Sequence, residues 1–348
     1  MNKNIIILIL LNFALISLTA IFSLNKIDLF YKQSLFWILG FILFFSFLFI
    51  NYHLIFERYI SYFIIILSLI ILILVLFVPS NLKSWFNLFF FNFQPSEFSK
   101  IGFFIVLAFW LSYYHKDLKN PLYIVFSFLT ISPFLFLIFL QPDFGMVFLY
   151  FTIWLFVILP FLTKKEIIIG ILIIAILFLI LWFFVLKEYQ KERFLILFNP
   201  EKDPLKSGYN LRQIKITLST SSFFGKGVGL GDIGREGFLP AAHTDFILTF
   251  LIEERGILIF IIYTLLIYIL LSQILASYKY YNKNPLIKNF IYIIFQYFLV
   301  KYIITSLVNF GLFPIIGLPV PFLSYGGSHL VFDLWLLGIL INLGEKRI

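Results

Sequence analysis

Apolar stretches about as long as a bilayer is thick recur along the whole chain. A helix needs ~20 mostly apolar residues to cross the hydrocarbon core. We count ten such stretches, at about 5–24, 34–50, 59–78, 97–114, 121–140, 143–160, 166–186, 245–275, 286–310 and 326–343. Because lipid offers no partners for backbone polar groups, such spans must be helical. We therefore predict an all-α, polytopic integral membrane protein with a single membrane domain over residues 1–348.

The composition agrees with this fold class and excludes others. The chain is 62% hydrophobic and 12% charged, whereas soluble domains carry about 25% charged residues. The net charge of +9 is scattered over short loops, so it does not indicate a nucleic-acid partner. The sequence contains no cysteine, which excludes a disulfide framework and thiolate chemistry.

Lysines and arginines in short loops predict the orientation in the membrane. With the N-terminus inside, the short outer loops hold only Lys26, Lys32 and Lys83. The cytoplasmic segments then hold Lys3, Arg58, Lys116, Lys119, Lys164, Lys165, Lys279, Lys283, Lys288, Lys346 and Arg347. We therefore predict that both termini are cytoplasmic and that segment 188–244 is a large extracytoplasmic loop. Its own charges do not oppose this, since long loops translocate regardless of charge.

The stretch QPSEFSK, residues 94–100, places charges at the start of the fourth span. Pro95 suits a first helical turn, where its missing N–H costs nothing. Glu97 and Lys100 then share one helical face at i,i+3 spacing. They form either a local ion pair beside a helix cap or a polar wall facing a cavity, since charges inside membranes face the protein interior or water.

Two further polar stretches fall on the same predicted outer side. In QPDFG, residues 141–145, Asp143 is either a turn residue or part of a site. In FLPAAHTDF, residues 238–246, Asp245 precedes the eighth span, which is long enough to tilt or to begin outside the membrane. Asp245 either complements the helix dipole or serves a site. For His243 we favour an ordinary surface role.

A glycine-rich stretch lies upstream of these residues. It looks like a phosphate-cradling loop, but glycine runs are weak signals, and we expect a flexible loop. No strand precedes it, which excludes a dinucleotide-binding fold. The residues concerned are Gly225, Lys226, Gly227, Gly229 and Gly231.

The stretch GLFPIIGLPVPFLSYGGSHL, residues 311–330, combines three prolines and four glycines at membrane depth. Non-helical backbone is tolerated there only where it is buried in protein or lines water. We predict a re-entrant or irregular segment near 311–328, with a plain outer turn as the alternative. Lys301 and Asp333 flank it as charges of opposite sign that can pair.

Each of these stretches has an ordinary structural explanation when it is taken alone. Together they gather polar side chains near one face of the membrane, which indicates a polar site that opens outward. The residues are Glu97, Lys100, Asp143, Asp245, Ser324 and Tyr325.

In chain order, QPSEFSK, QPDFG, FLPAAHTDF and GLPVPFLSYGG resemble the signature stretches of the SEDS family, named for shape, elongation, division and sporulation. The resemblance covers nearly the whole chain. It implies a ten-span peptidoglycan glycosyltransferase of the bacterial cytoplasmic membrane. The stretch YQKERFLILFNPEKDPLKSGY followed by GKG is more like RodA, the elongation branch, than like FtsW, the division branch.

The resemblance also implies roles for particular residues. Asp245 would be the catalytic aspartate, with Glu97, Lys100 and Asp143 lining the polar cavity beneath it. The chain departs from the family at Ser219–Ser222, at Thr305–Leu307, at His329 and at Asp333, which affects fine substrate contacts and leaves the four motifs intact. To the candidate substrate or cavity residues we add Lys226, His243, Ser324 and Tyr325.

The substrate that the resemblance implies is lipid II, a disaccharide-pentapeptide on undecaprenyl pyrophosphate. Converting its α-linked pyrophosphate into a β-1,4 bond inverts the sugar centre once. A single displacement needs a base on the acceptor hydroxyl and no covalent nucleophile, and Asp245 is our candidate. Lys100, Lys226 or a divalent cation (Mg²⁺ or Mn²⁺) shared with the pyrophosphate can offset its charge. No closed set of protein metal ligands is visible.

Two rival functions and one partner follow from the same features. A lipid II flippase would need polar groups along the whole crossing path, whereas the charges here crowd the outer side. A pure scaffold would leave Asp245 without a task. The chain has no transpeptidase serine motif, and the RodA resemblance implies a class B penicillin-binding protein as partner. Its single helix would pack on the eighth and ninth spans, which flank Asp245.

Overall fold

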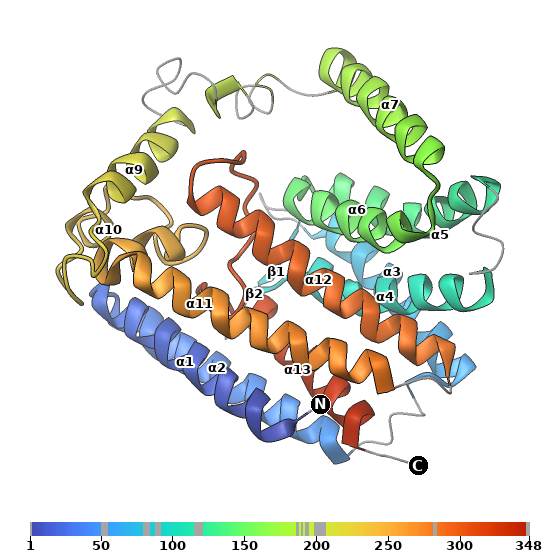
Figure 1. Cartoon of the computed structure of the whole chain (residues 1–348), viewed down its shortest axis with the longest axis horizontal. Coiled ribbons are helices and arrows are strands. Elements are labelled where there is room, and N and C mark those ends of the chain that lie inside the picture. The colour runs from blue at the N-terminus through green and yellow to red at the C-terminus, as the bar shows by residue number, and fades with distance from the viewer. Residues whose placement is uncertain are drawn as a thin grey trace.

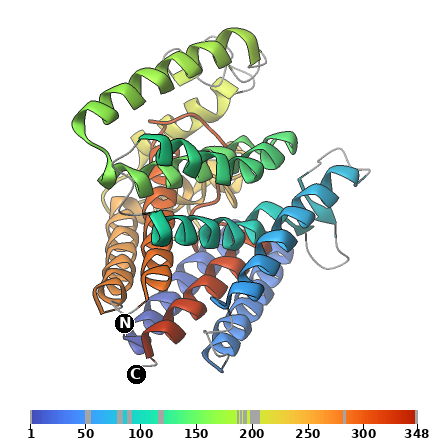
Figure 2. The ribbon, with the colours of Figure 1, turned by 90° about the vertical axis from the view of Figure 1, so that its right-hand side faces the viewer.

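The computed structural model is a bundle of long helices (Figures 1 and 2). It describes residues 2–49, 55–78, 84–87, 92–114, 121–185, 188, 191, 195–197, 207–280 and 284–345. The long helices are α1 (Lys3–Ser23), α2 (Ile27–Phe49), α3 (Arg58–Leu74), α4 (Pro95–Tyr114), α5 (Pro121–Leu140), α6 (Phe144–Ile158), α7 (Lys164–Ile180), α11 (Ile247–Tyr280), α12 (Pro285–Asn309) and α13 (Gly327–Glu345).

Shorter elements complete the described fold. Helices α9 (Ser207–Thr220) and α10 (Asp232–Arg235) lie between α7 and α11. Strands β1 (Phe86–Asn87) and β2 (Asn92–Phe93) form a small antiparallel hairpin, with Phe86 opposite Phe93. Single turns extend three helices, as 3-10 helix at Val75–Phe77 and Leu159–Phe161 and as π-helix at Leu181–Val185.

The predicted all-α membrane fold is confirmed. Seven of the described helices are long and apolar enough to cross a membrane, namely α1, α2, α3, α5, α6, α11 and α12. The other three predicted spans are helices as well, but they are shorter or more polar. Helix α4 opens with two charged residues, α7 has 17 residues, and the apolar part of α13 is Gly327–Leu343.

Capping residues explain where several helices begin. Asn2 accepts a hydrogen bond from the backbone of Asn4 ahead of α1, and Asn284 accepts one from Leu286 ahead of α12. Pro285 occupies the first turn of α12, where no intrahelical donor is lost. Pro95 opens α4 in the same way, as predicted.

Helix α12 is the centre of the bundle. Of the membrane-length helices described, it is the most enclosed, with 67% of its span buried. It packs against α4, α6 and α11, while α13 packs against α2 and α4 (Figure 1). Side chains on α4, α12 and α13 therefore meet inside protein rather than lipid.

The two ends of the bundle differ (Figure 1). The start of α1 and the end of α13 lie at one end. At the other end lie α9, α10, the start of α11 and the turn between α1 and α2. This agrees with termini on one side and the long loop on the other, although much of 188–206 lies outside the described residues.

The irregular segment near 311–328 is confirmed in the fold. No helix or strand covers Gly311–Gly326, and α13 begins at Gly327. Its backbone carbonyls accept from buried side chains, namely Leu323 from Ser17 (2.9 Å) and Ser324 from Gln33 (3.2 Å). The second half of the segment is thus enclosed by protein, which supplies partners for its polar groups.

Candidate active site

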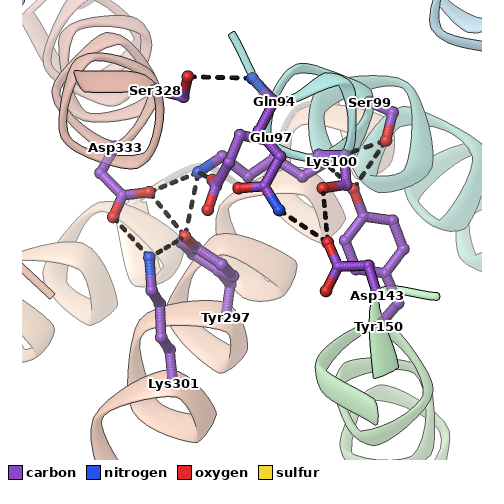
Figure 3. Close-up of polar contacts among 11 residues, drawn as sticks. Gln94, Glu97, Ser99, Lys100, Asp143, Tyr150, Tyr297, Lys301, Ser328 and Asp333 are labelled. Atoms are coloured by element: carbon purple, nitrogen blue, oxygen red, sulfur yellow. Dashed lines mark hydrogen bonds and ion pairs between the residues drawn. The ribbon is translucent and has the colours of Figure 1, made fainter. Parts of the chain in front are cut away.

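A group of five residues, here called the charge cluster, joins α4, α12 and α13: Glu97, Lys100, Tyr297, Lys301 and Asp333 (Figure 3). Lys100 Nζ lies 2.6 Å from Glu97 Oε2 and 2.5 Å from Asp333 Oδ1. Lys301 Nζ lies 3.0 Å from Asp333 Oδ2. The Tyr297 hydroxyl donates to Asp333 (2.6 Å) and accepts from both lysines (3.0 and 2.9 Å).

The cluster is neutral and almost completely withdrawn from the surface. Two ammonium groups face two carboxylates, and all four side chains are buried, at 0–1% exposure. Burying ions costs several kcal/mol each, roughly, unless geometry and hydrogen bonds compensate, and here every charged group has more than one partner or a short contact.

The structure contains both ion pairs that the sequence suggested for this region. The i,i+3 pair of Glu97 and Lys100 exists, and the suggested pairing of Lys301 with Asp333 is confirmed. Glu97 and Lys100 face other charged side chains inside the bundle rather than an open surface.

Asp143 connects the starts of α4 and α6. Its Oδ1 accepts from the backbone N–H of Met146 (3.2 Å) and so caps α6. Its Oδ2 accepts from Gln94 Nε2 (2.7 Å) and from Ser96 (3.3 Å), beside the charge cluster (Figure 3). The turn residue predicted from QPDFG is therefore also a cross-link between the two polar motifs.

The segment that carries Asp245 is held by three hydrogen bonds to other elements. Ser324 Oγ donates to the Thr244 carbonyl (2.6 Å), and the Tyr325 N–H donates to the His243 carbonyl (2.8 Å). Asn309 Nδ2 donates to the Asp245 carbonyl (2.8 Å). Ser324 and Tyr325 were predicted members of the site, and the structure brings both against the Asp245 segment.

Asp245 itself is partly exposed, and the irregular segment lies close to it at Gly317. A Cβ at Gly317 would lie 3.9 Å from Asp245 Oδ2. A Cβ at Gly145, in the first turn of α6, would lie 2.4 Å from the Ile316 carbonyl. The irregular segment at 316–317 therefore lies close to both Asp245 and the first turn of α6.

His243 lies beside a lysine of the α1–α2 turn. Lys26 Nζ is 3.4 Å from His243 Nδ1, and the His243 and Tyr325 ring centres are 5.8 Å apart. Burial, together with the positive charge of Lys26, lowers the pKa of His243 to about 4. The imidazole is therefore neutral at pH 7, and Lys26 is the cation next to the Asp245 segment.

The glycine-rich stretch is packed against α11, so the expectation of a flexible loop is wrong. Helix α11 breaks at Gly256, with φ 71° and ψ −174°. The Glu253 and Glu254 carbonyls released there accept from the N–H groups of Lys226 (3.0 Å) and Gly227 (2.8 Å). Loop backbone thus replaces the missing helical hydrogen bonds.

Two acidic side chains fix the same loop. Glu253 accepts from Lys226 Nζ (2.8 Å) and from the N–H groups of Ile233 and Gly234 (3.0 and 3.2 Å). Glu254 accepts from Gly229 N–H (2.7 Å) and from Ser23 (2.8 Å). The hydrogen bond to Glu253 raises the pKa of Lys226. The acids at the start of the eighth span therefore anchor the loop.

We expect Gly256→Ala to lower the melting temperature. A Cβ there would lie 2.0 Å from the Phe223 carbonyl, and the positive φ is itself strained for alanine, at about 1–3 kcal/mol. The control is Gly170→Ala on α7, where a Cβ meets nothing within 4 Å and alanine favours the helix. Equal melting temperatures for both variants would contradict the packed loop.

A family model for FtsW, RodA and SpoVE, described as cell cycle protein, matches residues 2–347. The chain belongs to this family. It is the SEDS family that the four sequence motifs resemble, and the match covers all of the charge cluster and the Asp245 segment.

Relatives from both branches match, under the names FtsW and MrdB, of which MrdB belongs to the RodA branch. The chain is 28% identical over 326 residues to the probable peptidoglycan glycosyltransferase FtsW of Geobacter sp. (strain M18), covering 90% of this chain and 86% of the relative. It is 31% identical over 281 residues to the peptidoglycan glycosyltransferase MrdB of Escherichia coli K12, covering 78% and 73%.

Solved structures share the fold. A chain from a peptidoglycan synthase complex that coordinates polymerisation and crosslinking superposes with a TM-score of 0.81 at 26% identity, covering 98% of this chain and 97% of that one. RodA of Thermus thermophilus gives a TM-score of 0.69 at 22% identity, covering 99% and 97%. The bundle is therefore the SEDS fold.

Sequence reasoning missed several residues that build the site. Tyr297 and Asn309 lie within an apolar helix, and Glu253 and Glu254 lie within the eighth predicted span. One signal was available for Tyr297 and Asn309, because both share the α12 face of Lys301 at multiples of four residues.

Proposed function

We propose that this chain is a peptidoglycan glycosyltransferase that polymerises lipid II into glycan strands. The observation that carries the proposal is the Asp245 segment. It holds a partly exposed carboxylate at one end of a membrane bundle. Its backbone carbonyls accept hydrogen bonds from Asn309, Ser324 and Tyr325. A substrate with a polar glycan and a lipid tail requires a polar group at such a boundary.

The reaction we propose is a single displacement. The Asp245 carboxylate takes the proton of the acceptor sugar hydroxyl as that oxygen attacks C1 of the donor. The C1–O bond to pyrophosphate breaks, and the pyrophosphate leaves with the bonding electron pair. One inversion converts the α linkage to β, so a second carboxylate acting as a nucleophile is not needed.

Several cations are available to offset the pyrophosphate charge. Lys226 supports this role better than Lys100, because its side chain is 29% exposed whereas that of Lys100 is fully buried between two carboxylates. Lys26, next to His243, is a third cation at this end. Positive charge placed before the reaction stabilises a leaving pyrophosphate.

A divalent cation would need ligands from the substrate. Within the described residues, no group of three His, Cys, Asp or Glu side chains is arranged to hold a metal ion. Asp245 and pyrophosphate oxygens are hard ligands of the kind that Mg²⁺ or Mn²⁺ takes. The donor set therefore fits a cation shared with substrate and does not fit one held by the protein alone.

The distribution of charge favours an enzyme over a flippase. Glu97 and Lys100 lie in the first two turns of α4, and Asp333 lies seven residues into α13. These charges occupy the half of the bundle near Asp245, and they are closed into ion pairs. Toward the other end of α12, the hydrogen bonds of Asn289 to Ser112 and of Gln296 to Tyr292 join neutral groups, and the charged Lys288 lies near the start of the helix, 4.9 Å from the Tyr278 ring centre.

The test uses the purified full chain in detergent or vesicles with lipid II. We expect glycan strands on a gel, with release of undecaprenyl pyrophosphate. Transfer of labelled lipid II between leaflets without any strand formation would support the flippase instead.

The finer assignment within this function is to cell elongation. The loop stretch that resembles RodA supports it, although FtsW and MrdB relatives match comparably. Expression in cells depleted of either their elongation or their division polymerase tests it. We expect rod shape to return in the first and filamentation to persist in the second, and the reverse result would assign division.

We further propose a class B penicillin-binding protein as partner. We also propose the membrane orientation predicted from the lysines and arginines, with both termini in the cytoplasm. Helix α12 is largely enclosed, so α11 supplies most of the available surface. Its exposed face carries Ile261 (49%), Leu265 (55%) and Tyr268 (68%) at helical spacing. Helices associate in lipid by close packing rather than by hydrophobic exclusion, so steric fit at this face decides binding.

We expect Leu265→Trp to reduce co-purification with such a partner, together with partner-stimulated polymerisation. The control is Ile66→Trp on α3, which is equally exposed (56%) on another side. Full stimulation of Leu265→Trp by the partner would contradict α11 as the interface. If no such partner stimulates the unmutated chain, the partner proposal itself would be wrong.

A further inference from the structure

Asn309 ends α12 with a completely buried side chain (0%). Its amide nitrogen donates to the Asp245 carbonyl (2.8 Å) and to the Thr305 carbonyl (2.9 Å). Its Oδ1 accepts from the Thr249 N–H (3.0 Å) and lies 3.0 Å from the Thr249 hydroxyl. A side-chain amide has two donors, and both are used here, while the single proton of the Thr249 hydroxyl is shared between Oδ1 and the Asn309 backbone carbonyl (2.8 Å).

These hydrogen bonds act on the start of α11. The N–H of Thr249 belongs to the first turn of that helix, where backbone donors lack helical partners. Asn309 therefore caps α11 from a different helix. The same side chain holds the carbonyl of Asp245, two residues before the helix, and so fixes the backbone from which that carboxylate projects.

Asn309 is itself fixed by a line of polar residues on α12. Tyr297, Lys301, Thr305 and Asn309 follow one another at i,i+4 spacing, which places them on one helical face. Lys301 contacts Tyr297 (2.9 Å), the Thr305 hydroxyl donates to the Lys301 carbonyl (2.7 Å), and Asn309 donates to Thr305. All four are buried, at 0–1%. This face runs from the charge cluster to Asp245.

We propose that Asn309 is a positioning residue for the glycosyl transfer, which sets the place of Asp245 relative to α12. The proposal rests on the proposed function, because Asn309 acts on the reaction only through Asp245. Ser324 and Tyr325 hold the two preceding residues, and Asn309 holds the carbonyl of Asp245 itself.

The test is Asn309→Leu, which keeps the branched arrangement of four side-chain heavy atoms and removes both donors and the acceptor. We expect kcat for lipid II polymerisation to fall by about 10²-fold, the loss typical of a reacting group displaced by roughly 1 Å. We expect KM to stay within about twofold, since Asn309 does not contact substrate in this scheme. The matched control is Asn289→Leu, near the other end of α12, where the amide donates to Ser112 (3.0 Å). It should leave both constants unchanged.

A second variant covers the case in which Asn309→Leu does not fold. Thr249→Val is nearly isosteric and removes the hydroxyl that contacts Asn309. The donor from Asn309 to Asp245 remains, held less firmly. We expect a smaller fall in kcat, again with KM unchanged, in a protein that melts as one folded species.

Three results would overturn the proposal. They are wild-type kcat in folded Asn309→Leu, a loss carried by KM, or a loss that only follows the amount of folded protein. If Asn309→Leu does not fold, wild-type kcat in Thr249→Val would overturn the proposal instead. An Asp245→Asn variant measured alongside separates the two hypotheses, because its retained activity would remove Asp245 as the general base, whereas absence of glycan strands from the unmutated chain would remove the proposed function. Inactivity of Asp245→Asn beside an active Asn309→Leu would remove only the positioning role.

Discussion

Asp245→Asn is expected to lose about 10²–10⁴-fold in the rate of glycan-strand formation, the range that a positioned general base contributes. The substitution keeps the shape of the side chain and the backbone hydrogen bond from Asn309, so the segment should stay in place. It removes only the carboxylate that accepts the proton. Polymerisation of purified lipid II, read as strand length and yield on a gel, measures this.

Asp28→Asn is the matched control. Asp28 is an exposed acid at the same end of the bundle, in the first turn of α2. It should polymerise at the wild-type rate. Equal melting temperatures for both variants would attribute the loss to chemistry, and a fully active Asp245→Asn would remove Asp245 as the base.

The second large effect is on stability. Asp333→Leu leaves Lys100 and Lys301 buried with Glu97 as the only described carboxylate in contact with either lysine. Removing one partner from a buried ion group costs about 3–5 kcal/mol, because an uncompensated charge remains. We expect a large fall in the detergent melting temperature. The double variant Lys301→Met with Asp333→Leu restores neutrality and should recover most of it.

The exposed pair Lys191–Glu188 provides the control. It has the same i,i+3 spacing as Lys100–Glu97 and a similar distance of 2.9 Å, but Glu188 is 83% exposed. Solvent screens such pairs, so Glu188→Ala should not change the melting temperature measurably. A double variant as unstable as Asp333→Leu would show that the cluster contributes specific hydrogen bonds rather than charge balance.

What could be predicted from the sequence depended on whether the contact is local. The pairing of Glu97 with Lys100 follows from helical spacing alone, and the start of α4 follows from Pro95. The irregular segment before α13 follows from the prolines and glycines that cannot continue a helix. Each of these requires knowledge of only one short stretch.

Contacts between helices could only be suggested. Lys301 and Asp333 lie 32 residues apart, and their meeting depends on how α12 and α13 rotate against each other. Apolar residues surround both helices, so hydrophobic periodicity does not specify that rotation. The glycine loop was misjudged for a related reason. Its partner is the helix break at Gly256. In the sequence, a long apolar run follows this glycine and predicts a continuous helix, so the break could not be predicted.

The charge cluster also constrains how the protein is made. Helices enter the membrane in chain order, and α4 brings its own ion pair of Glu97 and Lys100. Helix α12 brings Lys301, whose carboxylate partner arrives only with α13. An unpaired lysine at the centre of a helix costs about 2.5–3.5 kcal/mol on insertion scales. Completion of the bundle core therefore waits for the last helix, because a nascent chain that has not yet inserted α13 holds Lys301 without its Asp333 partner.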